Sequence, residues 1–410
     1  MSDTLDRRIG LLGSVAVGVS SMVGAGLFVV FAPAVAAAGD GLLAALTIAA
    51  VVAACNATSS ARLAALYPVA GGTYVYGRER LGPFWGHLAG WSFVVGKLAS
   101  CAAMATAIGA YAWPEHQRPV AVGVVVALTA INLCGVQKSV AVGIVVASVV
   151  LIVVAVAVVV LWSAPPAQPT EGRTGVGGVL EAAGLLFFAF AGYARLATLG
   201  EEVRDPTRTI PRAITIAVIV VVAVYAAAAL ALLHVLGPSR LASSTRPFVT
   251  ALEAADASPL VPFVVAAAAL AAGGALLSLL LGVSRTTLAM ARDGHLPRQL
   301  ARVGERHRVP HVAEAAAGAI VYALVLLGDL TTSIAFSSFC VLVYYAVANA
   351  AALTLPAQVA VRATSALGLA GCLLLASSLP GTTVLSGLVV IAVGATTYAL
   401  RRLVGRRRDI

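Results

Sequence analysis

The sequence is poor in charged residues. Only 11% of its 410 residues are Asp, Glu, Lys or Arg, and 60% are hydrophobic, whereas a soluble protein has about 25% charged residues. A soluble fold of this size is excluded because its surface would need many more charges. A disordered chain is excluded by the high hydrophobicity, and a collagen-like chain because the 39 glycines follow no strict period. A polytopic membrane protein remains.

Patterns typical of metal, disulfide or nucleotide chemistry are also missing. The six histidines form no HExxH motif and no CxxC is present, so neither a metal centre nor a cofactor is indicated. There is no Walker A loop, so nucleotide hydrolysis is not the expected energy source. The five cysteines lie in apolar stretches and are expected to be small buried residues: Cys55, Cys101, Cys134, Cys340 and Cys372.

Long apolar runs dominate the chain. A helix needs roughly 20 apolar residues to cross the hydrocarbon of a bilayer, and these runs are too long and too continuous for the alternating strands of a β-barrel. They predict an all-α polytopic membrane protein with 12 transmembrane helices, at about 10–36, 41–62, 84–112, 119–135, 139–162, 177–200, 211–236, 260–290, 313–328, 334–355, 365–379 and 383–403. The first run follows Arg7 and Arg8 without a small-residue cleavage site, so we interpret it as an uncleaved span.

The basic residues are distributed unevenly between the two sides. With a cytoplasmic N-terminus, 21 of the 27 Lys and Arg residues fall in cytoplasmic segments, and only Arg118, Arg173, Arg240 and Arg246 fall on the opposite side. The remaining two, Lys97 and Arg195, lie within predicted spans. This bias follows the positive-inside rule, and an even number of spans places both termini in the cytoplasm. The net charge of +10 is therefore a topology signal, and no nucleic-acid partner is expected. The basic tail RRLVGRRRDI is suited to anionic lipid headgroups.

Two spans carry a glycine-centred interruption near their middle. The first span contains SSMVGAG (residues 20–26), and the sixth contains FFAFAGY (residues 187–193). Gly24 and Gly26 are two residues apart, so they cannot serve one packing face, but they suit a local unwinding. Paired interruptions in the two halves of a chain point to a transporter binding site at the bilayer midplane. The alternative is that these glycines only allow close helix packing.

Unwound helices offer a specific chemistry. The N-terminus of a half-helix presents free N–H groups and a positive dipole end, which suit a carboxylate. Unwound carbonyl groups suit an ammonium group. A site with both is complementary to the zwitterionic head of an α-amino acid, and it needs no charged side chain.

Four segments resemble one transporter family. GVSSMVGAGLF in the first span is similar to the family's glycine-rich signature, and YPVAGGTYVYGRERLGPFWGHLAGW (residues 67–91) resembles its segment leading into the third span. FFAFAGYARLATLGEEVRDPTRTIPRAI (residues 187–214) and SRTTLAMARDGHLPRQLARV (residues 284–303) resemble its sixth span with the following loop and the end of its eighth span. On these motifs the chain is identified as a member of the amino acid–polyamine–organocation permeases.

This resemblance implies a leucine-transporter-like fold, with a five-plus-five inverted repeat and two additional C-terminal helices. Residues 1–403 would form one transmembrane transporter domain. Its first repeat would cover about 10–162, its second about 177–355 and its extra helices about 365–403, followed by a basic cytoplasmic tail at 404–410.

The resemblance also implies a substrate site at the two interruptions. The substrate's carboxylate and part of its ammonium group would be held by Ser21, Met22, Val23, Gly24, Ala25 and Gly26. The remaining carbonyl groups and an aromatic lid would come from Phe188, Ala189, Phe190, Ala191 and Gly192.

The chain departs from many relatives in the fifth span, where residues 147–151 read ASVVL and contain no lysine. The lysine that carries a proton or stands in for a sodium ion in those relatives is therefore absent from this span. A second departure follows the sixth-span break, where Ala194 and Arg195 stand in place of an acidic or small polar residue.

Ionisable residues inside spans are costly and are functional candidates. Lys97 lies well inside the third span. It could select substrates, pair an acidic side chain or carry a coupling proton, or it could cap helix carbonyls or snorkel. Further candidates for coupling or selectivity are Glu181, Arg195, Glu201 and Ser278. Arg195 could pair with Glu201 or Glu202 in an inner gate, although the mixed charges of that loop also fit a solvated clamp between helices.

The predicted function is secondary transport in the cytoplasmic (inner) membrane of a bacterium. The chain would move an amino acid or a related amine by alternating access, through proton symport or exchange. Alternatives within the fold are an amino acid exporter and a polyamine or amine antiporter. A membrane enzyme or a sensor is disfavoured, because the loops hold no cluster of His, Asp or Glu and no soluble domain. Expected partners are a small-molecule substrate, protons as candidate co-substrate and the bilayer, and the oligomeric state is left open. The Ala- and Val-rich walls favour small or aliphatic substrates.

Overall fold

The first predicted span is divided into three helical pieces. In the computed structural model, which describes residues 9–67, 71–135, 140–168, 175–193, 203–304 and 309–406, α1 (Leu11–Met22) ends before a non-helical stretch, and α2 (Gly26–Val29) follows. Val23 leaves the helical region with ψ of 70°. Val30 keeps helical angles and joins α2 to α3 (Phe31–Ala38). The interruption predicted within residues 20–26 of the first span is confirmed, and it lies at residues 23–25.

Every predicted apolar run contains helical structure among its described residues, and residues 194–200 of the sixth run lie outside them. The remaining long helices are α4 (Leu42–Leu66), α6 (Pro83–Ala112), α7 (Gln117–Leu133), α8 (Val140–Ser163), α9 (Val176–Phe190), α11 (Pro206–Ala242), α13 (Val261–Arg292), α14 (His311–Leu327), α15 (Leu330–Leu353), α16 (Val359–Ser378) and α17 (Gly381–Arg406). Within the described ranges, nine helical segments are long and apolar enough to cross a membrane, and α9 and α14 are shorter apolar helices. The chain is thus a largely helical polytopic membrane protein. The total of 12 crossings and the inverted repeat stay predictions.

Shorter helices connect the spans. α5 (Thr73–Leu81) precedes α6, and α12 (Pro247–Ala254) follows α11. α5 begins after Gly71 and Gly72, whose φ angles of 125° and 54° lie in the region that only glycine adopts easily. α16 begins six residues earlier than the predicted run, because Arg362 lies on its exposed side and does not end the helix.

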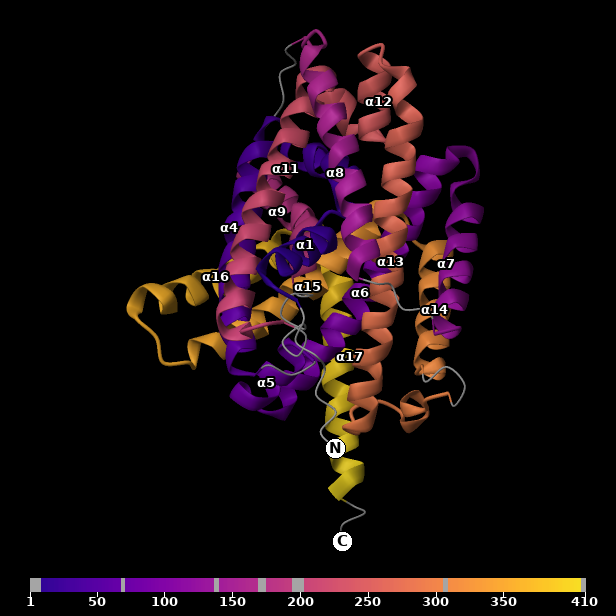
Figure 1. Ribbon diagram of the computed structural model, residues 1–410. Coiled ribbons are helices and arrows are strands. Elements are labelled where there is room, and N and C mark those ends of the chain that lie inside the picture. Colours follow the sequence, from indigo (N-terminus) through magenta and orange to yellow (C-terminus); the bar gives the residue numbers. More distant parts are fainter. Residues whose placement is uncertain are drawn as a thin grey trace.

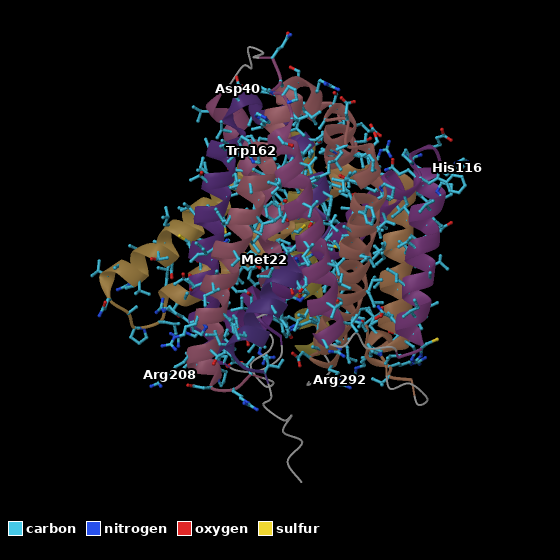
Figure 2. The ribbon with its side chains drawn as sticks, turned by 45° about the horizontal axis from the view of Figure 1, so that its top comes forward. Met22, Asp40, His116, Trp162, Arg208 and Arg292 are labelled. Carbon is cyan, nitrogen blue, oxygen red and sulfur yellow. The ribbon has the colours of Figure 1, made fainter. Side chains whose placement is uncertain are left out.

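The helices run side by side (Figure 1). Figure 2 shows Arg208 and Arg292 at one end, Asp40, His116 and Trp162 at the opposite end, and Met22 between them. The amide of Arg204 donates to the carbonyl oxygen of Ile9 over 2.9 Å, so the starts of α1 and α11 lie together. The break beside Met22 therefore lies at mid-depth in the bundle.

Small residues let the central helices approach closely. A β-carbon added at Gly96 of α6 would lie 2.7 Å from Cβ of Cys340 in α15, so only glycine fits there. The outer helices present apolar side chains outward, and Val145, Ile152 and Val159 of α8 are 61%, 63% and 69% exposed. This pattern is the one expected of a surface in contact with lipid.

Polar side chains attach α16 to the core. Asn349 of α15 donates through Nδ2 to Oδ1 of Asn56 in α4 over 2.6 Å. The hydroxyl groups of Ser59 in α4 and Ser365 in α16 are 2.9 Å apart. Hydrogen bonds of this kind hold helices together where lipid offers no hydrophobic driving force.

The predicted burial of the cysteines is wrong at one position. Four of them are buried, but Cys134 is exposed. α7 ends at Leu133, and Cys134 is its C-cap at the surface of the bundle.

Candidate functional site

The two interrupted helices lie directly against each other. α9 ends at Phe190 and passes into a 3₁₀ turn, η3 (Ala191–Tyr193). A β-carbon added at Gly192 would collide with the carbonyl group of Ser21 and lie 2.8 Å from the Met22 nitrogen. One added at Gly26 would lie 2.9 Å from Cβ and 3.0 Å from Cα of Ala189. The two breaks predicted from separate halves of the sequence therefore meet, backbone against backbone.

The break in the first span leaves backbone groups available. Among the described residues, the amides of Gly24 and Ala25 donate to no backbone carbonyl group. They precede α2, where free amide groups and the helix dipole favour a negative charge. The carbonyl oxygen of Met22, on the other side of the break, accepts a hydrogen bond from the hydroxyl of Tyr225 over 3.2 Å. The break thus places the amide groups of Gly24 and Ala25, which have no backbone acceptor, near the carbonyl oxygen of Met22, which Tyr225 already hydrogen-bonds.

Lys97 reaches the broken end of α9. Its side chain is 5% exposed, and Nζ lies 3.4 Å from the carbonyl oxygen of Ala191 as a donor. The hydroxyl of Tyr345 in α15 donates to the same oxygen over 3.3 Å. Of the alternatives left open by the sequence, this contact matches a lysine that caps a free carbonyl group. The ammonium group also brings a positive charge to the end of α9.

The aromatic residues near the breaks pack on tyrosines. The ring of Phe190 is fully buried with its centroid 5.5 Å from that of Tyr225, and Phe187 lies 5.8 Å from Tyr345 in an edge-on arrangement. Phe188 is 7% exposed. Phe190 is therefore part of the wall behind the breaks, and the aromatic lid implied by the family resemblance stays a prediction.

The other predicted residues are spread more widely. Ser278 donates to the carbonyl oxygen of Gly274 within α13 over 2.9 Å, one turn from Ala275, whose Cβ would lie 3.3 Å from a β-carbon at Gly24. Ser278 is thus on the α13 face that meets the first break. Glu181 lies near the start of α9, roughly 13 Å along the helix from Phe190. Arg195 and Glu201 lie outside the described residues.

Two tyrosines at the site were not singled out from the sequence. Tyr225 and Tyr345 come from α11 and α15, are at most 1% exposed and bond to the carbonyl groups at the two breaks. Aromatic residues make up only 6% of the chain, so a tyrosine within an apolar span was an available signal.

A second buried polar cluster involves a carboxylate. Asn132, near the end of α7, donates to Oε1 of Glu314 in α14 over 2.8 Å and to the carbonyl oxygen of Leu277 over 3.3 Å. Glu314 is 1% exposed, and its Oε2 has no hydrogen-bond partner within the described part of the chain. Glu314 lies one residue inside the predicted ninth span, a position that suggests an interfacial charge and not a buried one.

We expect Glu314→Ala to destabilise the protein by about 1–3 kcal/mol, because it leaves a buried donor of Asn132 without its partner. Glu314→Gln keeps the accepting oxygen and is the matched control, expected to unfold near the wild-type temperature. Thermal unfolding of the purified protein in detergent measures both. Equal destabilisation by the two variants would contradict a role for this hydrogen bond.

Comparisons with known proteins agree with this architecture. The family model for amino acid permeases matches residues 13–398, a range that includes both breaks. An uncharacterized transporter of Mycobacterium tuberculosis is 56% identical over 411 residues, which covers 99% of this chain and 93% of the relative. The branched-chain amino acid permease BcaP of Bacillus subtilis is 25% identical, with 76% of this chain and 72% of the relative covered. The serine/threonine exchanger SteT of the same organism is 26% identical, with 84% and 82% covered. The chain belongs to the amino acid permease family of the amino acid–polyamine–organocation superfamily.

Proposed function

We propose that this chain is a secondary transporter of amino acids in the cytoplasmic membrane, with its termini in the cytoplasm. The substrate would bind where the two broken helices meet. The observation that carries the proposal is the contact of Gly192 with the Ser21 carbonyl group, which brings the breaks of the two halves to one point at mid-depth. Such a point is where transporters built from inverted repeats hold their substrates.

The chemistry of the breaks fits a zwitterion. The amides of Gly24 and Ala25 would bind the substrate carboxylate, and Lys97 would add a positive charge nearby. The carbonyl oxygen of Met22 would accept from the ammonium group together with Tyr225. The five-plus-five repeat, with α16 and α17 as additional helices, would supply the rocking motion.

A small or aliphatic neutral amino acid is the proposed substrate class. Ala189, Ala275 and Tyr225 lie against the breaks, and the ring of Phe190 packs on Tyr225. Two relatives carry names that indicate branched-chain amino acids and serine or threonine. Transport would be driven by proton symport or by exchange, and one of these relatives is named as an exchanger.

Reconstitution into liposomes tests this function. We expect labelled leucine, alanine or serine to accumulate above protein-free liposomes, either with a pH gradient or with unlabelled amino acid inside. Arginine and putrescine serve as the comparison. Uptake of putrescine without uptake of any neutral amino acid would contradict the proposed substrate class and favour amine antiport. Efflux without uptake would favour an exporter.

A further inference from the structure

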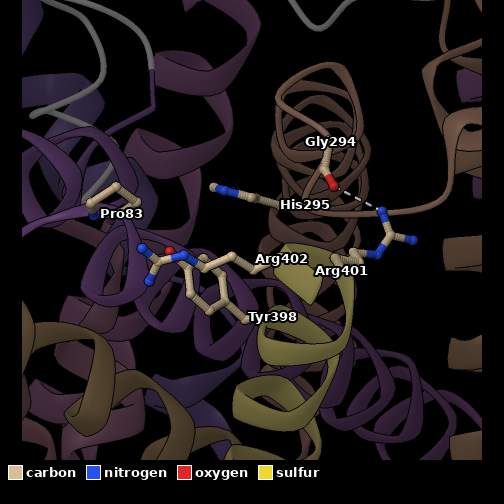
Figure 3. A pocket seen from close by; sticks show the side chains of 6 residues that line it. All are labelled: Pro83, Gly294, His295, Tyr398, Arg401 and Arg402. Carbon is tan, nitrogen blue, oxygen red and sulfur yellow. Dashed lines mark hydrogen bonds between the residues drawn. The ribbon is translucent and has the colours of Figure 1, made fainter. Parts of the chain in front are cut away.

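A cavity lies at the end of the bundle that carries Arg208 and Arg292, away from the helix breaks. Its volume is about 320 Å³. Pro83 at the start of α6, Gly294 and His295 after α13, and Tyr398, Arg401 and Arg402 of α17 line it (Figure 3). The cavity is therefore formed where three membrane helices end at one face.

The lining of this cavity is cationic. Arg401 and Arg402 both reach it, and neither forms an ion pair with an acidic side chain in the part of the chain that the structure describes. Arg401 donates through Nη1 to the carbonyl oxygen of Gly294 over 2.9 Å, which fixes its guanidinium group at the rim. The other nitrogens of both guanidinium groups are suited to an oxyanion.

The surroundings of the cavity point to lipid. Leu400 of α17 is 57% exposed and Trp85 of α6 is 44% exposed, so apolar surface adjoins the cationic lining. Further along α17, Leu388 and Val389 are 56% and 54% exposed. An aromatic residue at a helix end and a continuous apolar helix face are typical of the interface and of acyl-chain contact. A headgroup in the cavity could therefore have its chains along α17.

His295 connects the cavity to the junction of α5 and α13. Its Nδ1 lies 3.1 Å from the hydroxyl of Tyr74, which donates to Asp293 over 2.5 Å. Arg78 of α5 pairs with Asp293 over 2.9 Å. An occupant that touches His295 therefore contacts a network that joins the two elements.

The pKa of His295 is lowered by burial, and Arg78 and Arg401 lower it further while Asp293 opposes them. An anion in the cavity would raise this pKa, because it stabilises the protonated imidazole. The titratable and charged groups that face His295 are Tyr74 and Arg78 of α5, His87 of α6, Asp293 after α13, and Tyr398 and Arg401 of α17.

We propose that this cavity binds the phosphate group of an anionic membrane lipid through Arg402 and His295, while Arg401, held by the carbonyl group of Gly294, adds positive charge at the rim. Basic pockets between transmembrane helices on the cytoplasmic side suit such headgroups. The bound lipid would hold the ends of α6, α13 and α17 together. Binding would tighten as the pH falls, because the bound phosphate favours protonated His295.

Native mass spectrometry of the purified protein tests the proposal with phosphatidylglycerol and phosphatidylcholine. We expect the wild type to retain phosphatidylglycerol preferentially and the double variant Arg401→Gln/Arg402→Gln to bind it on the order of tenfold more weakly. Phosphatidylglycerol should also raise the unfolding temperature of the wild type more than that of the double variant. Arg362→Gln removes an exposed arginine of α16 outside the cavity and is the matched control.

The source of the phosphate is decided by two further arms. Inorganic phosphate and glycerol 3-phosphate are each added in place of the lipid, and neither is expected to raise the unfolding temperature. A higher unfolding temperature with inorganic phosphate or with glycerol 3-phosphate, in the absence of lipid, would assign the cavity to a soluble phosphate and overturn the proposal of a lipid. Equal retention of phosphatidylglycerol by the wild type and the double variant would overturn the site itself. Because these readouts need no transport, they stand apart from the proposed function.

Discussion

Gly192→Ala is expected to lower amino acid uptake by at least about tenfold, while the protein stays folded in the membrane. The added methyl group would collide with the carbonyl group of Ser21 and lie 2.8 Å from the nitrogen of Met22. These are backbone atoms, so the clash is relieved only if the two breaks move apart, and overpacking of this kind costs about 1–3 kcal/mol. Initial uptake rates in proteoliposomes, corrected for the amount of protein incorporated, measure the effect.

Two other glycines make this prediction specific. Gly282→Ala is the matched control, because nothing lies within 4 Å of a β-carbon at that position in α13. It should transport at the wild-type rate. Gly26→Ala should have a smaller effect than Gly192→Ala, because Cβ and Cα of Ala189 lie 2.9 and 3.0 Å from the added β-carbon and overlap with it less than the Ser21 carbonyl group does at Gly192. Near wild-type uptake by Gly192→Ala would show that the contact between the breaks is not part of the transport site.

Lys97→Met is expected to reduce uptake by about tenfold to a hundredfold. The substitution keeps a side chain of similar length but removes the charged donor to Ala191, and a hydrogen bond to a charged group contributes about 1.5–3 kcal/mol. Tyr345→Phe removes the neutral donor to the same oxygen and should have a smaller effect, about fivefold. Uptake rates as a function of substrate concentration and pH compare the two variants.

The pH profile separates two roles of Lys97. If the ammonium group carries the coupling proton, Lys97→Met should lose the pH dependence of uptake, whereas Tyr345→Phe should keep it. If it only holds the end of α9, both variants should be slower with the wild-type pH dependence. Wild-type rates for Lys97→Met, with slower Tyr345→Phe, would show that the charge is dispensable.

The helices and their interruptions were predictable because their signals are local. Apolar runs of the right length predict membrane helices. Gly24 and Gly26, two residues apart, predict a break that the structure places at residues 23–25. The short helix α5 was missed because its composition is polar and its start depends on the backbone angles of Gly71 and Gly72. Cys134 was placed inside a span because composition alone does not show where α7 ends.

The partners of the site residues were not predictable in the same way. Lys97 and Ala191 are 94 residues apart, Tyr345 and Ala191 are 154 apart, and Tyr225 and Met22 are 203 apart. No periodic pattern along the chain reports which of several apolar faces meet. Sequence analysis could therefore name Lys97 as exceptional while leaving its partner open.

By itself the sequence determined the membrane environment, the helical class and the position of two breaks, and it predicts the cytoplasmic side from the basic residues. These properties follow from hydrophobicity, charge and backbone flexibility, which each segment expresses independently of the others. Only the tertiary structure decided that the breaks meet, that Lys97 and Tyr345 share one carbonyl oxygen, and that Glu314 is buried beside Asn132. These contacts depend on how the helices pack. A different packing angle between two helices would bring other residues into contact, although the hydrophobicity and charge of each helix would stay the same.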